Sequence, residues 1–164
     1  MEGAVWEQVH TIVSSLDYPM VVVTAAVDGE RSGCLVGFST QCSIHPTRFF
    51  VGISKKNHTY GVACRASHLG LHFLSVDEQA LASLFGERTG DQVDKFASVR
   101  WHPGPDGVPI VDDCANWAVV RIVDHADGGD HVGFITEPVD AHGTGPFEPL
   151  RYQHVKDFHA GHEP

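Results

Sequence analysis

The chain has 164 residues, of which 42% are hydrophobic and 20% are charged, and its formal net charge is −10. This length is typical of one domain with a sizeable core, so we expect a single domain over residues 1–164. The acidic balance argues against a nucleic-acid backbone or an anionic membrane surface as a partner. No apolar run approaches the roughly 20 residues that span a bilayer. An anionic ligand would therefore need a local basic pocket.

The start of the chain and its cysteines indicate a cytoplasmic protein. Residues 1–7 lack the basic and apolar regions of a secretory signal. Cys34, Cys42, Cys64 and Cys114 are widely spaced, which fits reduced thiols better than a disulfide framework or a zinc site.

The first half of the chain predicts one helix followed by strands. Residues 4–16 have apolar positions at helical spacing and predict a short amphipathic helix. The β-branched run 20–27 and the stretch 33–44 flank Asp28 and Gly29, which predicts a β-hairpin. Further elements are a strand over 49–53, a helix over 57–67 with Asn57 as N-cap, and a strand over 69–75.

The second half predicts another helix, a turn and a long hairpin. Residues 77–85 form a helical pattern closed by Gly86, and a polar stretch follows over 90–100. The Pro/Gly-rich residues 103–107 are typical of a turn that joins strands. A second hairpin has strands over 115–126 and 131–141, and the tail has short ordered candidates at 150–152 and 155–158.

These elements predict a mainly β fold with peripheral helices. Six or more strands and three short helices favour a closed or nearly closed antiparallel barrel. We find no internal repeat and no linker that would divide the chain.

One strand is unusually poor in bulky side chains. Between residues 36 and 43, Gly37, Ser39, Thr40 and Ser43 interrupt the larger apolar residues. Glycine inside a strand often marks a close backbone approach, which a flavin ring would exploit by accepting hydrogen bonds from strand amides. A bulge at a barrel corner is the alternative, and spacing alone leaves both open.

Residues 54–59 place two lysines, an amide side chain, a histidine and two hydroxyls before the helix predicted over 57–67. A helix N-terminus offers free amides and partial positive charge to a phosphate. An ordinary N-cap with solvated lysines is the alternative. The Gly-rich Walker pattern is absent, so a nucleoside triphosphate is not indicated.

Other catalytic patterns are weak. His154, His159 and His162 lie close in the tail, and His125 and His131 bracket a predicted hairpin, but no His-Glu-x-x-His pattern occurs. We therefore predict no metal site. No Gly-x-Ser-x-Gly elbow supports a serine nucleophile.

The ordered blocks of the chain resemble the flavin reductase-like family, which has the FMN-binding split-barrel fold. The blocks span roughly residues 17–142 and are 33–46, 54–59, Asp94-Lys95-Phe96, Trp101 and Gly129-Asp130-His131. The resemblance implies an antiparallel Greek-key split β-barrel with a core over about 17–142 and a C-terminal extension over 143–164. The chain differs from the usual family pattern over residues 35–39, where it has Leu-Val-Gly-Phe-Ser in place of Thr-x-Ser-Ser-Phe.

The same resemblance implies an activity. A member of this family would transfer hydride from NAD(P)H to FMN or FAD as a homodimer, and would supply reduced flavin to a partner monooxygenase. A non-catalytic carrier or sensor of the same fold, binding a flavin or a tetrapyrrole, is the alternative.

The resemblance also assigns site residues. Those that would border the isoalloxazine and ribityl chain are Gly37, Phe38, Ser39, Thr40, Gln41 and Cys42. Those that would hold the phosphate are Ser54, Lys55, Lys56, Asn57 and Thr59. Lys95 and Phe96 match an element near the ligand, and His131 matches a histidine on the nicotinamide side and is the candidate catalytic residue.

Overall fold

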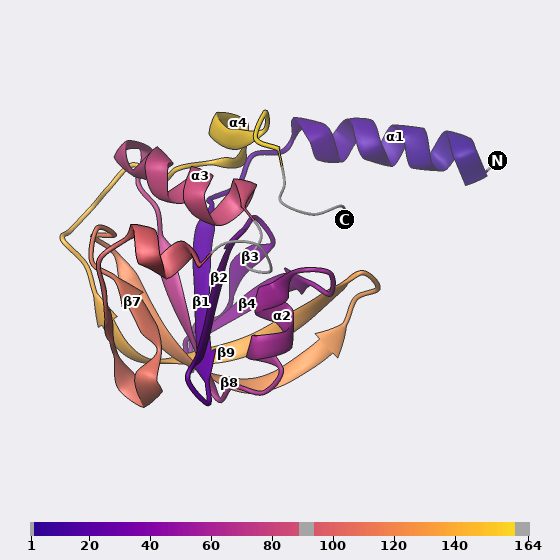
Figure 1. The fold of residues 1–164 in the computed structure, drawn as a ribbon. Coiled ribbons are helices and arrows are strands. Elements are labelled where there is room, and N and C mark those ends of the chain that lie inside the picture. Colours follow the sequence, from indigo (N-terminus) through magenta and orange to yellow (C-terminus); the bar gives the residue numbers. More distant parts are fainter. Residues whose placement is uncertain (1, 89–93, 160–164) are drawn as a thin grey trace.

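The computed structural model describes residues 2–88 and 94–159, and most of its strands form one seven-stranded sheet (Figure 1). Every pairing in this sheet is antiparallel, and the strand order is β2-β1-β5-β8-β9-β4-β3. The strands are β1 (Val21–Val27), β2 (Glu30–Val36), β3 (Ser39–Ser43), β4 (Arg48–Ser54), β5 (His68–Phe73), β8 (Trp117–Asp127) and β9 (His131–His142). The predicted turn over 103–107 joins a separate antiparallel pair, β6 (Trp101–Pro103) and β7 (Pro109–Val111). The mainly β, antiparallel prediction is confirmed.

The helices lie outside the sheet. They are α1 (Glu2–Ser15), α2 (His58–Ala63), α3 (Gln79–Glu87) and α4 (Tyr152–Val155), with 3₁₀ turns η1 (Val76–Glu78), η2 (Lys95–Ser98) and η3 (Pro105–Gly107). Figure 1 shows that α1 projects away from the rest of the molecule. Within residues 2–88 and 94–159, no helix has the length and apolar character needed to cross a membrane.

Local sequence explains the first predicted hairpin and the start of α2. Asp28 and Gly29 both have positive φ, 52° and 79°, as a tight primed turn between strands requires. The Asn57 side chain accepts a hydrogen bond of 2.9 Å from the Thr59 amide, which confirms Asn57 as the N-cap of α2.

Several predicted boundaries differ from the structure. The helix predicted over 57–67 ends at Ala63. The strand predicted over 33–44 is two strands, because the chain bends at Gly37 and Phe38 between β2 and β3. Helix α3 does not stop before Gly86 but runs through it to Glu87. A Cβ at Gly86 would lie 2.8 Å from Leu35 Cδ2, so this glycine permits close packing of the helix on β2 rather than ending the helix. Residues 90–93 of the predicted polar stretch lie outside the described part.

The C-terminal tail contributes Leu150 and Val155 to the core. Leu150 is fully buried, and its carbonyl accepts a 2.8 Å hydrogen bond from the Met20 amide at the start of β1. The Leu150 amide donates to the Leu74 carbonyl at 2.8 Å. The tail thus closes a second apolar cluster beneath α3, separate from the cluster inside the barrel.

His72 on β5 is a buried polar side chain whose two ring nitrogens are both used. Nδ1 lies 3.1 Å from the Val22 carbonyl oxygen, and Nε2 accepts a 3.0 Å hydrogen bond from the Val111 amide. These partners define the neutral tautomer with the proton on Nδ1. Burial lowers the pKa of His72 to about 4.

We expect His72 to make the fold acid-sensitive. Its pKa is about 4 when folded and near 6.5 when unfolded, so the unfolded state binds more protons between these values. The free energy of unfolding should therefore fall as the pH drops through this window, by at most roughly 3 kcal/mol. Urea denaturation of wild type and His72→Gln, which keeps a donor and an acceptor, should show a shallower pH slope for the variant. Equal slopes would assign the acid sensitivity to other groups.

Candidate functional site

The bend between β2 and β3 borders a pocket of about 400 Å³, called here the main pocket. This volume lies within the range of small-molecule sites. Its walls are mainly apolar, with a few polar side chains at the edges. The lining residues are Tyr18, Met20, Cys34, Leu35, Val36, Gly37, Phe38, Gly52, Ser54, Asn57, Phe85, Gly86, Arg88, His131 and Tyr152.

Gly37 allows the Tyr18 ring to lie against the bend. A Cβ at Gly37 would lie only 2.5 Å from Cε2 of Tyr18, so a larger residue would displace this ring. Tyr18 in turn stacks on Tyr152, with ring centroids 4.9 Å apart and an interplanar angle of 20°. Burial raises the pKa of Tyr18. On the other side of the bend, the Phe38 carbonyl accepts a 2.7 Å hydrogen bond from the Gly52 amide.

Strand register creates the polar edge of the main pocket. Ser54, the last residue of β4, pairs with His131, the first residue of β9. The His131 ring lies 4.9 Å from the Phe38 ring, tilted by 54°, and its Nδ1 lies 2.7 Å from Asp130 Oδ1. The hydrogen bond from His131 lowers the pKa of Asp130. Two segments far apart in the sequence thus meet at one edge.

The chain matches the flavin reductase like domain over residues 13–161. It belongs to this family. This flavin reductase-like chain is 31% identical over 144 residues to the reductase component of a 4-nitrophenol 4-monooxygenase/4-nitrocatechol 2-monooxygenase from Rhodococcus opacus, across 87% of this chain and 75% of that one. It is 27% identical over 146 residues to the ferric-chelate reductase (NAD(P)H) of Archaeoglobus fulgidus, across 88% and 85% of the two chains.

A solved structure confirms the fold. The flavin reductase domain protein from Arthrobacter sp. FB24 superposes with a TM-score of 0.81 at 24% identity, covering 93% of this chain and 91% of that one. The split-barrel assignment made from the sequence is therefore confirmed, together with the family.

The predicted flavin strand of this flavin reductase-like chain does not face a single pocket. Gly37 and Phe38 line the main pocket. Ser39, Thr40 and Gln41 instead line a second hollow of about 430 Å³, called here the side groove, and Cys42 is exposed and lines neither. The reason is the bend, because residues after Phe38 run along a different edge of the sheet. For the four residues from Ser39 onward, contact with the flavin remains a prediction.

Only some of the predicted phosphate residues line the main pocket. Ser54 and Asn57 line the main pocket, and the Ser54 hydroxyl accepts a 3.3 Å hydrogen bond from the Lys56 amide. Lys55 Nζ lies 2.9 Å from both carboxylate oxygens of Asp127, which raises the pKa of Lys55. Thr59 is fully buried, with its hydroxyl 2.8 Å from that of Ser32.

Lys95 and Phe96 do not line the main pocket. Lys95 is 4% exposed, and its Nζ donates to the carbonyl oxygens of Gly33 and Phe85, both at 2.9 Å. Burial lowers the pKa of Lys95. The Phe96 ring packs edge-on against Phe85, with centroids 5.7 Å apart. Because Phe85 is a wall residue, this pair supports the pocket through it.

Sequence reasoning missed several wall residues. Tyr18 precedes β1, Tyr152 lies in the tail, and Phe85, Gly86 and Arg88 belong to the end of α3 or follow it. No local spacing links these positions, because β-bridges such as Pro19 with Arg151 bring them together. The missed part of the site is therefore a product of tertiary structure.

The structure shows no metal-binding group among the residues it describes, where no three His, Cys, Asp or Glu side chains converge. His162 of the tail cluster lies outside those residues. All four cysteines are free thiols. Burial raises the pKa of Cys34 to about 11 and that of Cys114 to about 12, so neither is a thiolate at neutral pH.

We expect Thr59→Val to affect the fold rather than phosphate binding. The change removes a buried hydroxyl that bonds Ser32, and it should lower the free energy of unfolding by about 1–2 kcal/mol. Fluorescence titrations should show equal changes for FMN and for riboflavin, which has no phosphate. Thr47→Val, which removes an exposed hydroxyl, is the control and should change neither property. A selective loss of FMN affinity in Thr59→Val would instead establish the phosphate role.

Proposed function

We propose that this protein is an NAD(P)H-dependent flavin reductase that transfers hydride from a reduced nicotinamide to FMN or FAD. Membership of the flavin reductase-like family, together with a mainly apolar pocket whose polar edge joins Ser54 to His131, carries this proposal. The two relatives named above support it, since one is a monooxygenase reductase component and the other an NAD(P)H-dependent reductase.

The residues of the main pocket fit a flavin. A flat ring with one polar edge needs apolar walls, which Val36, Phe38 and Phe85 supply, and polar groups at one side, where Ser54 and Asn57 lie. A bound flavin supplies the hydride-accepting ring. The protein holds that ring against the nicotinamide and excludes water, because hydride transfer depends mainly on close stacking of the two rings.

We propose that His131 orients the ligand. Its Nδ1 is engaged by Asp130, and among the described residues Nε2 makes no hydrogen bond. The ring contact with Phe38 limits its rotation further. We assign His131 to the nicotinamide side of the main pocket, where Nε2 can hydrogen-bond a polar group of the donor.

The monooxygenase relative suggests how the product is used. We infer that reduced flavin leaves this protein for a partner monooxygenase, as the role of a reductase component requires. We place the reaction in the cytoplasm, where the four free thiols would stay reduced.

We further propose that the protein is a homodimer in which α1 packs on a second copy. No residue of α1 is buried. Its apolar side chains are 41–69% exposed and are Val5, Trp6, Val9, Ile12 and Val13. A helix of 14 residues is marginally stable in water without tertiary contacts, so this apolar face needs a partner.

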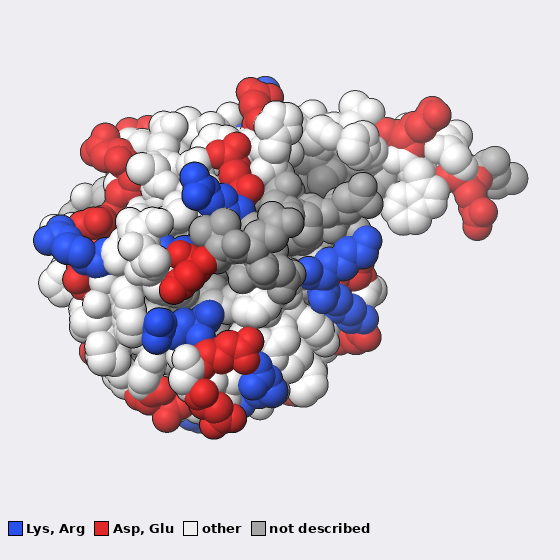
Figure 2. Space-filling model, viewed as in Figure 1, with Lys and Arg blue, Asp and Glu red and all other residues white. Residues whose placement is uncertain are grey.

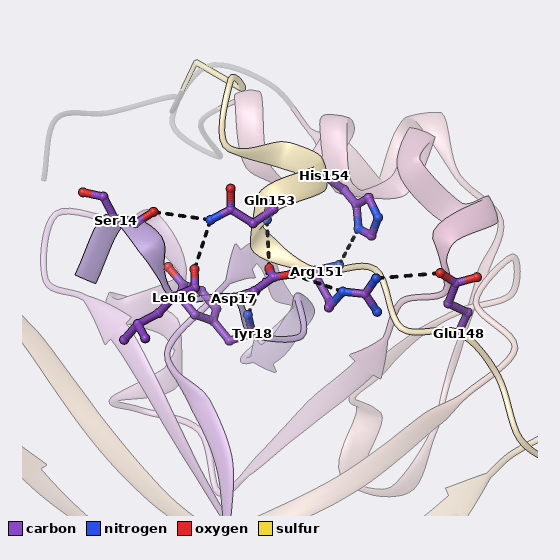
Figure 3. A network of polar contacts seen from close by, with 8 residues as sticks. All are labelled: Ser14, Leu16, Asp17, Tyr18, Glu148, Arg151, Gln153 and His154. Atoms are coloured by element: carbon purple, nitrogen blue, oxygen red, sulfur yellow. Dashed lines mark hydrogen bonds and ion pairs between the residues drawn. The ribbon is translucent and has the colours of Figure 1, made fainter. Parts of the chain in front are cut away.

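The base of α1 is anchored, which gives the helix a defined direction (Figure 3). Arg151 Nε donates to Asp17 Oδ2 at 3.1 Å, and the Gln153 amide donates to Asp17 Oδ1 at 3.0 Å. The Gln153 side chain also donates to the carbonyl oxygens of Ser14 and Leu16, at 3.3 and 3.1 Å. These bonds attach the last turn of α1 to the segment that begins α4.

The side groove offers a binding surface for α1 of the second copy. It opens beside Asp17 and is lined by apolar residues of the barrel, including Val21, Phe49 and Phe73. Its rim is β3, an edge strand that pairs only with β4 in the described sheet. In a two-fold dimer, each α1 would cover the side groove of the other copy, and both apolar surfaces would be buried.

The proposed reaction is tested by following nicotinamide absorbance. We expect oxidation of NADH or NADPH only when FMN or FAD is present. Phe38→Ala should raise the KM for flavin about 2–10-fold, since it removes an aromatic contact from the pocket wall. Ile44→Ala is the matched control, because Ile44 is also exposed and apolar but lies outside the main pocket. Tight flavin binding without nicotinamide oxidation would favour the carrier or sensor alternative.

The dimer is tested by light scattering coupled to gel filtration. Ile12→Glu places a charge on the apolar face of α1 and should yield monomers at concentrations where wild type is dimeric. Thr11→Glu adds the same charge to the opposite face of α1 and should remain dimeric. Thr40→Arg at the rim of the side groove should also yield monomers. A dimeric Ile12→Glu protein would exclude α1 as the contact, and a dimeric Thr40→Arg protein would exclude the side groove.

A further inference from the structure

The main pocket needs a cation if its ligand carries a phosphate. The net charge of −10 repels anions at long range. On the face seen in Figure 2, Lys and Arg side chains are interspersed with Asp and Glu rather than gathered into one basic surface. We therefore look for the charge that attracts a phosphate among the residues that line the pocket.

Neither lysine predicted for this role lines the main pocket, since Lys55 is paired with Asp127 and the exposed Lys56 lies outside the lining. Lys95, predicted to lie near the ligand, is buried against two carbonyl oxygens. Among the described residues that line the main pocket, the single Lys or Arg is Arg88. It directly follows α3 with an extended backbone, φ −118° and ψ 143°, and its side chain is exposed.

Arg88 also differs from the other arginines of the chain. It makes no ion pair or hydrogen bond with any described residue, and the adjacent carboxylate of Glu87 is bonded by the Ser83 hydroxyl and the His159 amide. Each other arginine has a partner. Arg31 stacks on Trp101, and the remaining five form ion pairs, namely Arg48, Arg65, Arg100, Arg121 and Arg151.

We propose that Arg88 binds a phosphate group of the nucleotide held in the main pocket. A guanidinium has a planar fork of donors that matches phosphate oxygens in a bidentate manner. This inference rests on the proposed flavin reduction. The phosphate belongs either to the flavin or to the nicotinamide nucleotide, and both present the same chemistry to Arg88.

Arg88→Gln, which replaces the charged guanidinium by a shorter neutral amide, distinguishes these sources. If Arg88 holds the flavin phosphate, the Kd for FMN and FAD should rise about tenfold while that for riboflavin stays unchanged. If it holds the nicotinamide nucleotide, flavin affinities should persist and the KM for the donor should rise instead. A larger rise for NADPH than for NADH would then identify the 2′-phosphate. Arg88→Lys should recover part of the loss.

Arg100→Gln is the matched control, because Arg100 is 80% exposed and lies outside the main pocket. Inorganic pyrophosphate provides a readout that does not depend on turnover. It should raise the melting temperature of wild type and of Arg100→Gln more than that of Arg88→Gln.

The two proposals fail in different ways. Kd, KM and pyrophosphate responses of Arg88→Gln within twofold of wild type would overturn the role of Arg88 and leave flavin reduction intact. A wild-type protein that oxidises no nicotinamide with any flavin would overturn the proposed function, while the pyrophosphate comparison would still decide whether Arg88 binds phosphate.

Discussion

The close approach of Tyr18 to the backbone at Gly37 is the constraint on which the site depends. A Cβ at this position would lie 2.5 Å from the tyrosine ring, so only glycine allows the ring to lie against the bend. The bend makes β2 and β3, which are consecutive in the chain, the two opposite edges of the sheet. The main pocket and the side groove follow from it, because Gly37 and Phe38 line one and Ser39 to Gln41 line the other.

Polar residues near the main pocket serve the fold as much as the ligand. In the described part of the chain, no buried side-chain nitrogen or oxygen lacks a hydrogen-bond partner. Leaving such a group unpaired costs about 1–3 kcal/mol, so Thr59 and Lys95 are committed to Ser32 and to carbonyl oxygens. Ser54, which lines the pocket, accepts a hydrogen bond from the Lys56 amide and can still donate its own hydroxyl hydrogen to a ligand.

Sequence patterns predicted the features that depend on local chemistry. Asp28-Gly29 predicted its hairpin because a tight turn needs positive φ, and Asn57 predicted its helix start because an amide oxygen caps free backbone amides. The bend at Gly37 was not predicted, since glycine in a strand is equally compatible with a ligand, a bulge or a nearby ring. The prediction that Gly86 ends the helix was wrong for a similar reason, because the contact that requires this glycine is with Leu35 on another element.

A family motif predicts which segments surround a ligand more reliably than which side chains touch it. Ser54 and His131 are brought together by the pairing of β4 with β9, whereas the burial of each neighbouring side chain decides whether it reaches the pocket. Lys95 matches the family pattern but is buried, while Arg88 matched no pattern yet lines the pocket without a partner among the described residues. An exposed guanidinium at the pocket edge stays hydrated until a ligand binds, so its presence costs the fold little free energy. Members of one fold can therefore differ at such a position, and with it in nucleotide preference.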